Sequence, residues 1–382
     1  MILSQKVRLK PTPGQEEKLW QSVGTARFIY NYTLAKQEEN NKNGGKFIND
    51  GDLRKEITLI KQTDQYKWLK EVSNNVAKQA VKDACNAYKN FFKGLADKPK
   101  FKSRRKSKPS FYNDTGKLKV KENLVLIEKV GWLKTAEQIP MDIKYTNPRI
   151  SFDGKYWYLA VGIERELQSV ELTNESIGID LGLKDLAIVS NIDKPFKNIN
   201  KTKEVKRLKK KLKRKQKQVS RKYEDSKIQI GKEGENRYKF TKTNNIEKIE
   251  REIRLIHRRL TNIRLNHIHQ ATTEIVKTKP SRIVVEDLNV SGMMKNKHLS
   301  KAIGEQSFYK FISILEYKSK FNGIEFVKAD RCYPSSKTCS SCGEIKKDLK
   351  LKDRVFNCPS CNIKIDRDKN ASINLSRYKK SA

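Results

Sequence analysis

The sequence predicts a mixed α/β protein, in which strands and helices alternate in the second half behind a strand-rich and helical first half. Three observations lead to this fold class. Runs of β-branched and aliphatic residues predict strands at 177–181, 186–190, 282–286 and 324–328. Helical spacing of apolar residues predicts helices within 202–277 and at 304–321. Two close pairs of cysteines near the C-terminus predict a small module of their own.

The first half opens on a predicted strand over 1–10. A helix start follows at Thr12, Pro13 and Gln15. The Thr hydroxyl is suited to cap the helix, Pro fits its first turn, and Gln completes a capping box. Helical spacing continues from there through Tyr30.

A second helix is predicted at 73–95, with Cys85 on its apolar face, where packing is the expected role. A Lys- and Arg-rich loop is predicted at 98–109, between two prolines. Strands then follow at 124–127, 149–152 and 156–161. The last two flank Asp153 and Gly154, and an Asp-Gly pair between β-rich runs is a strong hairpin signal.

A long basic region at 202–277 predicts a helical hairpin inserted between the strands of the α/β part. Its second half spaces apolar residues alternately three and four apart, as in the seam of a coiled coil. The turn of the hairpin is expected near Gly231 and Gly234. The seam consists of Ile246, Ile249, Ile253, Ile256, Leu260 and Ile263.

The composition predicts a polyanionic partner. The 382 residues carry 83 Lys and Arg against 44 Asp and Glu, which gives a formal net charge of +39. So large an excess repels itself unless a polyanion neutralises it. Nucleic acid is the leading candidate, because neutralising its phosphates releases counterions and drives binding. A ribosomal or simply basic protein explains the charge equally well, but not the carboxylates described below.

Other features limit the compartment and the partners. No apolar run approaches the roughly 20 residues that cross a bilayer, and the N-terminus has no hydrophobic signal region. We therefore expect no membrane role. Six cysteines in a chain of this length do not make a disulfide scaffold. A reducing cytoplasm is expected.

The clustered cysteines predict a structural zinc site. Cys339 and Cys342 form one CxxC pair, and Cys358 and Cys361 form another after fifteen residues. Two such turns aim four thiolates at one point and leave no open coordination position for catalysis. Gly343 and Asn362 follow the two pairs, where a positive φ is often needed. Two disulfides are the alternative, and a reducing compartment disfavours them. Cys332 has no assigned role.

Three carboxylates stand out in so basic a chain, because each lies at the end of a predicted element. They are Asp180, Glu286 and Asp368. Phosphodiester hydrolysis by two metals needs carboxylates that flank ions about 4 Å apart. Mg²⁺ prefers oxygen ligands and keeps several waters, so three acidic residues suffice. The pattern predicts a site that holds divalent metal, two Mg²⁺ ions, against phosphate.

Each carboxylate also has a simpler interpretation. A single Asp after a strand is more often a turn or cap residue than a ligand. Glu286 is followed by Asp287, and one of the two is expected to be merely solvated. Asp366 and Asp368 compete for the third position. The specificity of the pattern therefore comes from the three positions together.

With these motifs, nearly the whole chain resembles the TnpB (OrfB) family of transposon-encoded RNA-guided DNA endonucleases, relatives of the type V CRISPR effectors. The matching segments are PKFKSR at 99–104, GIDLGLK at 178–184, VEDLNV at 285–290, YPSSKTC at 333–339 and DRDKNA at 366–371. The combination is highly specific. Two departures are mild: Asn362 stands where glycine is usual, and Cys332 where an aromatic residue is common.

The resemblance implies a RuvC-like nuclease domain of the RNase H fold at 172–330 and 365–382, with the helical insertion at about 202–277 and a Cys₄ zinc ribbon at 331–364. It implies a wedge β-barrel at 1–10 and 98–171, interrupted by a helical recognition domain at 11–97. Asp180, Glu286 and Asp368 match the catalytic, Mg²⁺-binding triad of the family. Cys339, Cys342, Cys358 and Cys361 match its zinc ligands.

The implied activity is Mg²⁺-dependent cleavage of double-stranded DNA that matches a guide RNA, beside a short target-adjacent motif. The guide is transcribed from the transposon end. Base pairing reads the target sequence, while the protein contacts the backbone and recognises the shape of the nucleic acid. The resemblance also implies a prokaryotic cell, with the protein on the nucleoid when it is bound to DNA. An RNA-guided binding protein or repressor that does not cut is the alternative. A transposase that joins DNA ends lacks a recognisable nucleophile here, and a zinc-ribbon RNA-binding protein leaves the triad unexplained.

The resemblance and the charge together predict where nucleic acid is contacted. Phosphate contacts are expected from the basic loop and from the first helix of the insertion, although many single lysines there simply face solvent. The residues are Lys100, Lys102, Arg104, Arg105, Lys106, Lys210, Lys213 and Arg214. Phe101, Phe111 and Tyr112 are either stacking residues or core, and core is favoured.

Overall fold

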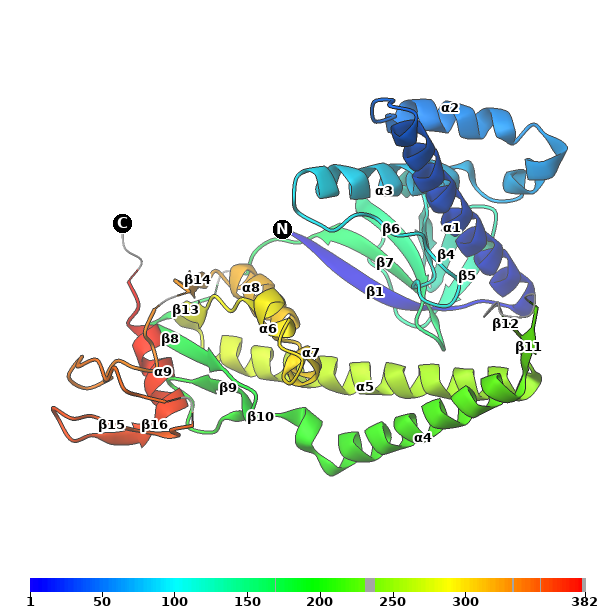
Figure 1. Ribbon diagram of the computed structural model, residues 1–382. Coiled ribbons are helices and arrows are strands. Elements are labelled where there is room, and N and C mark those ends of the chain that lie inside the picture. Colours follow the sequence, from blue (N-terminus) through cyan, green and yellow to red (C-terminus); the bar gives the residue numbers. More distant parts are fainter. Residues whose placement is uncertain (169, 231–237, 332, 351, 380–382) are drawn as a thin grey trace. The chain divides into compact units, whose positions relative to one another are not determined.

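The computed structural model describes residues 1–168, 170–230, 238–331, 333–350 and 352–379. The chain forms two compact units, Met1–Arg165 and Glu166–Ala382 (Figure 1). Within the described ranges, no helix combines the length and the apolar character that a bilayer span requires.

The first unit is built on a seven-stranded antiparallel sheet in the order β2-β6-β7-β1-β5-β4-β3. Its longest register pairs β1 with β7, from Ile2 opposite Glu164 to Leu9 opposite Trp157. The strand pairings described here leave β2 and β3 at opposite edges, so the predicted β-barrel stays a prediction. The strands are β1 (Ile2–Lys10), β2 (Ser110–Tyr112), β3 (Lys119–Lys121), β4 (Leu124–Ile127), β5 (Gly131–Thr135), β6 (Tyr145–Phe152) and β7 (Trp157–Glu164).

Helices accompany this sheet and supply part of its core. Leu19 and Val76, one from α1 and one from α3, pack with Val7 and Leu159 of the sheet. The capping box at the start of α1 is confirmed: Gln15 N–H donates to Thr12 Oγ1, and the Gln15 side chain accepts from Thr12 N–H. The helices are α1 (Pro13–Lys42), α2 (Asp50–Ile60), η1 (Asp64–Lys70), α3 (Asn74–Phe92) and η2 (Thr115–Lys117).

The second unit is built on a five-stranded mixed sheet in the order β10-β9-β8-β13-β14. β8 and β13 are parallel, as are β13 and β14, whereas β9 runs antiparallel to β8. The sheet strands are β8 (Thr173–Leu181), β9 (Asp185–Val189), β10 (Phe196–Lys197), β13 (Pro280–Glu286) and β14 (Glu325–Ala329). Two further hairpins pair β11 (Lys227–Gln229) with β12 (Tyr238–Phe240), and β15 (Val355–Asn357) with β16 (Lys364–Asp366).

Helices pack against the mixed sheet from both the insertion and the C-terminus. Ile177, Ile179 and Ile283 of the sheet share a core with Ile275 of α5 and Phe311 of α8. This core anchors the strand ends that carry the predicted carboxylates. The helices are η3 (Ile199–Lys201), α4 (Lys203–Asp225), α5 (Asn244–Lys277), α6 (Val290–Met294), α7 (Ser300–Gln306), α8 (Phe308–Phe321) and α9 (Arg367–Ser376).

Two predicted elements differ from the structure in detail. The helix expected at 304–321 is split into α7 and α8 at Ser307, whose φ of 59° is left-handed and therefore interrupts the helical backbone. The helical hairpin is confirmed as α4 and α5, but β11 and β12 extend its tip. Its predicted turn at Gly231 and Gly234 lies outside the described residues, as does Cys332.

Candidate active site and metal centre

Asp180 and Glu286 lie at the ends of neighbouring parallel strands. Asp180 is the penultimate residue of β8, and Glu286 is the last residue of β13. Val285 pairs with Ile179, so the two carboxylates follow directly on a paired position. Both residues are half-buried. Parallel pairing therefore places two acidic side chains at one edge of the sheet, as the sequence predicts.

A close approach between β8 and α9 brings the third carboxylate to this edge. A Cβ on Gly178 would lie 2.0 Å from the carbonyl oxygen of Ser372, so only glycine permits this contact. The hydroxyl of Ser176 donates to the carbonyl of Ser376 at 2.8 Å. Because α9 rests on β8 in this way, its first turn, which contains Asp368, lies in the electrostatic neighbourhood of Asp180.

The electrostatics of Asp180 reflect this crowding. Burial, followed by the charges of Asp368 and Glu286, raises its pKa to about 8, although Arg367 acts in the opposite direction. Burial and the neighbouring Asp287 also raise the pKa of Glu286. Carboxylates held against their own repulsion are typical of sites that function with a bound cation.

The three carboxylates are neighbours, yet their oxygens do not converge on one point. The guanidinium of Arg367 pairs with the carboxylate of Asp368: its Nε and Nη2 lie 3.2 and 3.1 Å from Oδ1 of Asp368. Arg354 lies 4.0 Å from the other oxygen. In the part of the chain that the structure describes, only the cysteine cluster gathers three or more potential ligands closely enough to hold a metal ion.

The competing carboxylates each have another partner. Asp366 caps α9, and its Oδ1 accepts the backbone N–H groups of Asp368 and Lys369 at 2.9 and 3.1 Å. Asp287 pairs with Arg331 at 2.9 Å. The cap gives Asp366 a structural role at the start of α9, whereas the pair of Asp287 with Arg331 is exposed.

The four cysteines converge as the sequence predicts. All four Sγ atoms lie within 4.8 Å of one another, with 3.6 Å between Cys339 and Cys361 and 3.5 Å between Cys342 and Cys358. A disulfide requires about 2.05 Å, whereas four sulfurs around a tetrahedral zinc stand about 3.8 Å apart. The thiols are free and suit a structural Zn²⁺.

The turns that carry these cysteines also match the prediction. Gly343 and Asn362 both have positive φ, at 82° and 59°. Their N–H groups donate to the carbonyls of Cys339 and Cys358, which closes the two knuckles. Backbone N–H groups near Cys358 lower the pKa of its thiol to about 6, whereas the pKa of its neighbour Cys342 is raised to about 12.

The predicted basic contacts are exposed, with one qualification. Lys100, Arg104, Arg105 and Lys106 lie on the surface of the loop after α3. Lys102 is exposed as well, but its ammonium lies 3.6 Å from the ring centre of Tyr30, and desolvation of this group lowers its pKa. This side chain therefore has a packing role that the loop's charge concealed. Of the aromatic residues, Phe111 is in the core, Tyr112 is half-buried and Phe101 is exposed.

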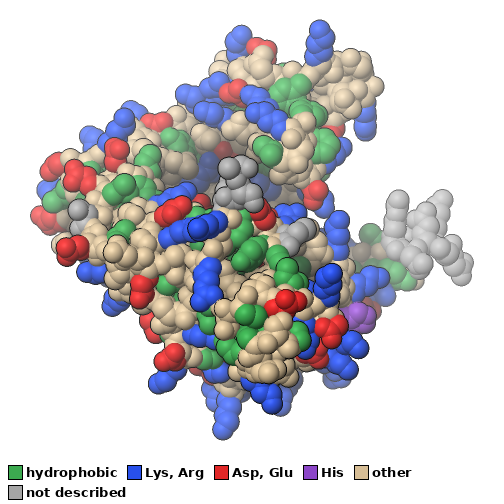
Figure 2. Space-filling model, turned by 90° about the vertical axis from the view of Figure 1, so that its left-hand side faces the viewer, with side chains coloured by type: hydrophobic (Ala, Val, Ile, Leu, Met, Phe, Trp, Pro, Cys, Tyr) green, Lys and Arg blue, Asp and Glu red, His purple; other side chains and the backbone are tan. Residues whose placement is uncertain are grey.

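Helix α4 presents a strongly basic outer face. Its buried and half-buried positions, such as Val205 and Leu208, face α5 in a shared apolar cluster. Lys and Arg side chains also spread over the face of the molecule shown in Figure 2. The exposed cations of α4 are Lys203, Lys206, Arg207, Lys210, Lys211, Lys213, Arg214, Lys217 and Arg221.

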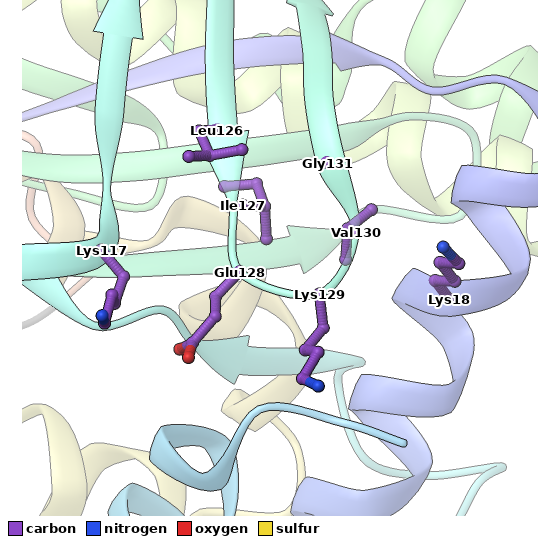
Figure 3. A pocket seen from close by; sticks show the side chains of 8 residues that line it. All are labelled: Lys18, Lys117, Leu126, Ile127, Glu128, Lys129, Val130 and Gly131. Carbon is purple, nitrogen blue, oxygen red and sulfur yellow. The ribbon is translucent and has the colours of Figure 1, made fainter. Parts of the chain in front are cut away.

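A cleft of about 420 Å³ in the first unit was not apparent from the sequence (Figure 3). Leu126, Ile127 and Val130 give it an apolar wall. The carboxylate of Glu128 is hydrogen-bonded by Ser73 and Asn75 at the start of α3. Three lysines line the cleft, from α1, from η2 and from the turn between β4 and β5, so their convergence has no signal in the local sequence. They are Lys18, Lys117 and Lys129.

Three family models match separate parts of the chain. Residues 158–297 match OrfB_IS605, described as "Probable transposase". Residues 308–375 match the "Cas12f1-like, TNB domain". Residues 1–46 match the helix-turn-helix domain of OrfB_IS605, and in this chain they contain β1 and the 30-residue α1.

Similar proteins span nearly the same length. The chain is 28% identical to "Putative RNA-guided DNA endonuclease InsQ" of Escherichia coli, over 97% of this chain and 90% of that protein. It is 29% identical to "Putative RNA-guided DNA endonuclease" of Streptomyces pristinaespiralis, over 97% of this chain and 87% of that protein. The fold resembles Cas12f1 in its complex with sgRNA and target DNA. The TM-score is 0.55 at 16% identity, over 94% of this chain and 82% of Cas12f1.

Proposed function

Since this chain belongs to the TnpB (OrfB) family, we propose that it cleaves DNA as a Mg²⁺-dependent, RNA-guided endonuclease encoded by a transposon. The observation that carries the proposal is the meeting of β8, β13 and α9, because it gathers Asp180, Glu286 and Asp368 at one sheet edge. Its target is double-stranded DNA that matches the guide RNA beside a short target-adjacent motif.

The donor set fits Mg²⁺. Asp180, Glu286 and Asp368 offer only carboxylate oxygens, the ligands that this ion prefers. When bound, Mg²⁺ supplies an activated water and stabilises the leaving oxygen of the phosphodiester. The chain itself contributes orientation, because the strand ends hold Asp180 and Glu286 on rigid backbone. The turn of Asp368 is held by the Asp366 cap and by the contact of α9 with Gly178.

The strand order supports a RuvC-like nuclease domain of the RNase H fold at 172–330 and 365–382. The central strand β8 carries Asp180 and has an antiparallel neighbour on one side and a parallel neighbour on the other. We assign the zinc ribbon to 331–364, the wedge β-barrel to 1–10 and 98–171, and the helical recognition domain to 11–97. Sequence-distant α9 belongs with the nuclease sheet because it packs on β8.

Guide RNA and DNA are the proposed polyanionic partners. The similar Cas12f1 structure is a complex with sgRNA and target DNA. In this chain, the exposed face of α4, the basic loop at 98–109 and the lysine-lined cleft of the first unit offer separate contacts to phosphate. Lys210, Lys213 and Arg214 lie on the first of these surfaces.

The test uses the full-length protein purified with its guide RNA and a matched plasmid target. We expect double-strand cleavage with Mg²⁺, no cleavage with EDTA or with an unmatched guide, and loss of cleavage in Asp180→Ala. Guide RNA binding should persist in that variant, which serves to show that the protein is folded. Undiminished cleavage by Asp180→Ala would remove the basis of the assignment.

One observation favours a second candidate, an RNA-guided DNA-binding protein that does not cut. Arg367 already pairs with Asp368, and the three carboxylates do not converge on one point. A protein of this kind would bind matched DNA with its guide but leave both strands intact in Mg²⁺ and in Mn²⁺. Strand nicking in either metal decides for the endonuclease.

A further inference from the structure

Asn370 joins α9 to the first zinc knuckle. Its Oδ1 accepts the backbone N–H of Ser340 at 2.9 Å, and its Nδ2 donates to the carbonyl of Thr338 at 2.7 Å. These two backbone groups bracket Cys339, one of the four thiols. The side chain of Asn370 is fully buried, and both ends of its amide are satisfied. Asn370 therefore hydrogen-bonds the backbone of the knuckle on both sides of Cys339.

The neighbouring residue anchors the same turn to the sheet. The ammonium of Lys369 donates to the carbonyls of Val189, Ser190 and Ile192, where β9 ends, at 2.9 to 3.1 Å. β9 in turn pairs with β8, and Ile188 is opposite Asp180. The first turn of α9 is thus fixed to the nuclease sheet by Lys369 and to the zinc knuckle by Asn370. Asp368 precedes both residues on this turn.

We propose that Asn370 is a positioning residue of the nuclease, which fixes the carboxylate of Asp368 by linking its helical turn to the zinc knuckle. The inference rests on the proposed function and adds to it a defined route from the structural metal to the active site. The knuckle keeps the backbone geometry that Asn370 pairs with only while its cysteines are held together. Zinc therefore supports metal binding at the carboxylates, and among the contacts between α9 and the knuckle the amide of Asn370 lies nearest to Asp368 in the chain.

The chemistry of the contact explains why asparagine occupies this position. One partner is a donor and the other an acceptor, and a carboxamide matches both without charge. Aspartate would leave the Thr338 carbonyl facing a buried negative charge. Alanine would leave the Ser340 N–H unpaired, at a cost of about 1–3 kcal/mol, while the Thr338 carbonyl would keep its donor from Asn374. Residues that orient metal ligands typically change metal affinity or activity about 10- to 100-fold when they are removed.

Asn374 offers a matched control on the same helix. Its Nδ2 donates to the carbonyls of Ser335 and Thr338, at 2.7 and 2.6 Å, and its side chain is also buried. It holds the same knuckle to the same helix, but lies one turn further from Asp368. A residue that merely docks the zinc module should resemble Asn374, whereas a positioning residue should not.

The experiment compares Asn370→Ala and Asn374→Ala in the full-length protein. Zinc content and unfolding temperature are measured first, and Asn370→Ser replaces the alanine variant if that one loses zinc or fails to fold. Mg²⁺ binding is then followed by calorimetry, and single-turnover cleavage is measured as a function of Mg²⁺ concentration. We expect Asn370→Ala to raise the Mg²⁺ concentration at half-saturation about 10- to 100-fold with zinc retained. Asn374→Ala should leave it within about threefold of the wild type.

Three results would overturn the inference: equal shifts in both variants, no shift in Asn370→Ala, or loss of zinc from the alanine and serine variants alike. A cycle with Cys339→Ser adds an independent check, because the Asn370→Ala effect should largely vanish once the knuckle is broken. Absence of guided cleavage by the wild-type protein counts against the proposed function instead. The Mg²⁺-binding contrast between the two asparagine variants still tests Asn370 in that case.

Discussion

Gly178 and Ser372 lie so close that a side chain on the glycine would penetrate the helix that faces it: a Cβ would lie 2.0 Å from the Ser372 carbonyl oxygen and 2.4 Å from the Ser376 nitrogen. The obstacle is backbone, which does not move aside as a flexible side chain does. Gly178 therefore sets the distance between β8 and α9, and with it the spacing of Asp180 and Asp368.

Gly178→Ala should displace α9 from its packing position on β8, because the added Cβ would clash with the helix backbone. We expect a stability loss of at least about 1–3 kcal/mol, as for overpacked cores, together with loss of cleavage. Thermal unfolding and guided cleavage measure the two effects. Gly24→Ala is the control, because a Cβ there has no atom within 4 Å and alanine favours the helix. Wild-type stability in Gly178→Ala would contradict the close approach.

Asp180→Asn should stabilise the metal-free protein while it abolishes cleavage. The raised pKa of Asp180, which follows from burial and then from Asp368 and Glu286, means that its charge opposes folding. A neutral amide removes that penalty. Unfolding temperature in EDTA near pH 8 should therefore rise relative to wild type. A lower temperature would show that the carboxylate makes favourable contacts instead.

The zinc ligands should be needed for metal content and for cleavage. Cys339→Ser removes one of four thiolates and breaks the segment that Asn370 pairs with. We expect less zinc per protein by elemental analysis, and loss of cleavage with guide RNA still bound. Cys85→Ala is the matched control, because Cys85 packs in the core of the first unit and should leave zinc content unchanged. Full zinc content and full activity in Cys339→Ser would refute the link.

Acid should weaken the first unit through Asp83. Burial alone would raise its pKa, but hydrogen bonds from Arg149, at 2.8 and 2.9 Å, and from Gln79 lower it below its usual 3.8. A lowered folded-state pKa contributes stability above the unfolded-state value, and this contribution is lost as pH falls through the folded-state pKa.

The corresponding variant is Asp83→Asn, which should cost about 1–2 kcal/mol at pH 7, because the ion pair is only partly buried. The difference from wild type should shrink as pH falls below about 4. Chemical denaturation of the isolated variant and wild type at several pH values measures it. A difference that stays constant down to pH 2 would exclude the Asp83 carboxylate as its source.

The basic face of α4 should contribute to the salt dependence of nucleic acid binding. Replacing Lys210, Lys213 and Arg214 by Gln should reduce the slope of log affinity against log salt by up to about 2–3. The control replaces Lys55, Lys67 and Lys320, each of which pairs with a carboxylate on its own helix. An equal change of slope in both triple variants would show only a general charge effect.

Caps, turns and strand ends were predictable from the sequence where their cause lies within a few residues. The capping box of Thr12 and Gln15 follows from residue types three positions apart, and the positive φ of Asn362 follows from the geometry of a CxxC turn. Parallel strands ending in Asp180 and Glu286 could also be expected from hydrophobic runs. The preference for Asp368 over Asp366 came from the family pattern, and the cap of α9 supplies its physical reason.

Features that depend on distant contacts were not predictable. The break at Ser307 lies inside an unbroken helical pattern, and nothing in the basic loop indicates that Lys102 stacks on Tyr30. The role of Gly178 depends on Ser372, almost two hundred residues further along the chain. These contacts form between segments that are distant in the sequence, so the spacing of apolar residues within one segment does not predict them.

The pairing of Arg367 with Asp368 has a further consequence. A guanidinium tethered beside the carboxylates acts as a resident counter-ion, which lets acidic groups stay together when no metal is bound. An incoming cation must then compete for Asp368 with the guanidinium of Arg367, which is covalently attached and cannot diffuse away. If the proposed function holds, a metal ion can bind Asp368 only by displacing Arg367 from that carboxylate.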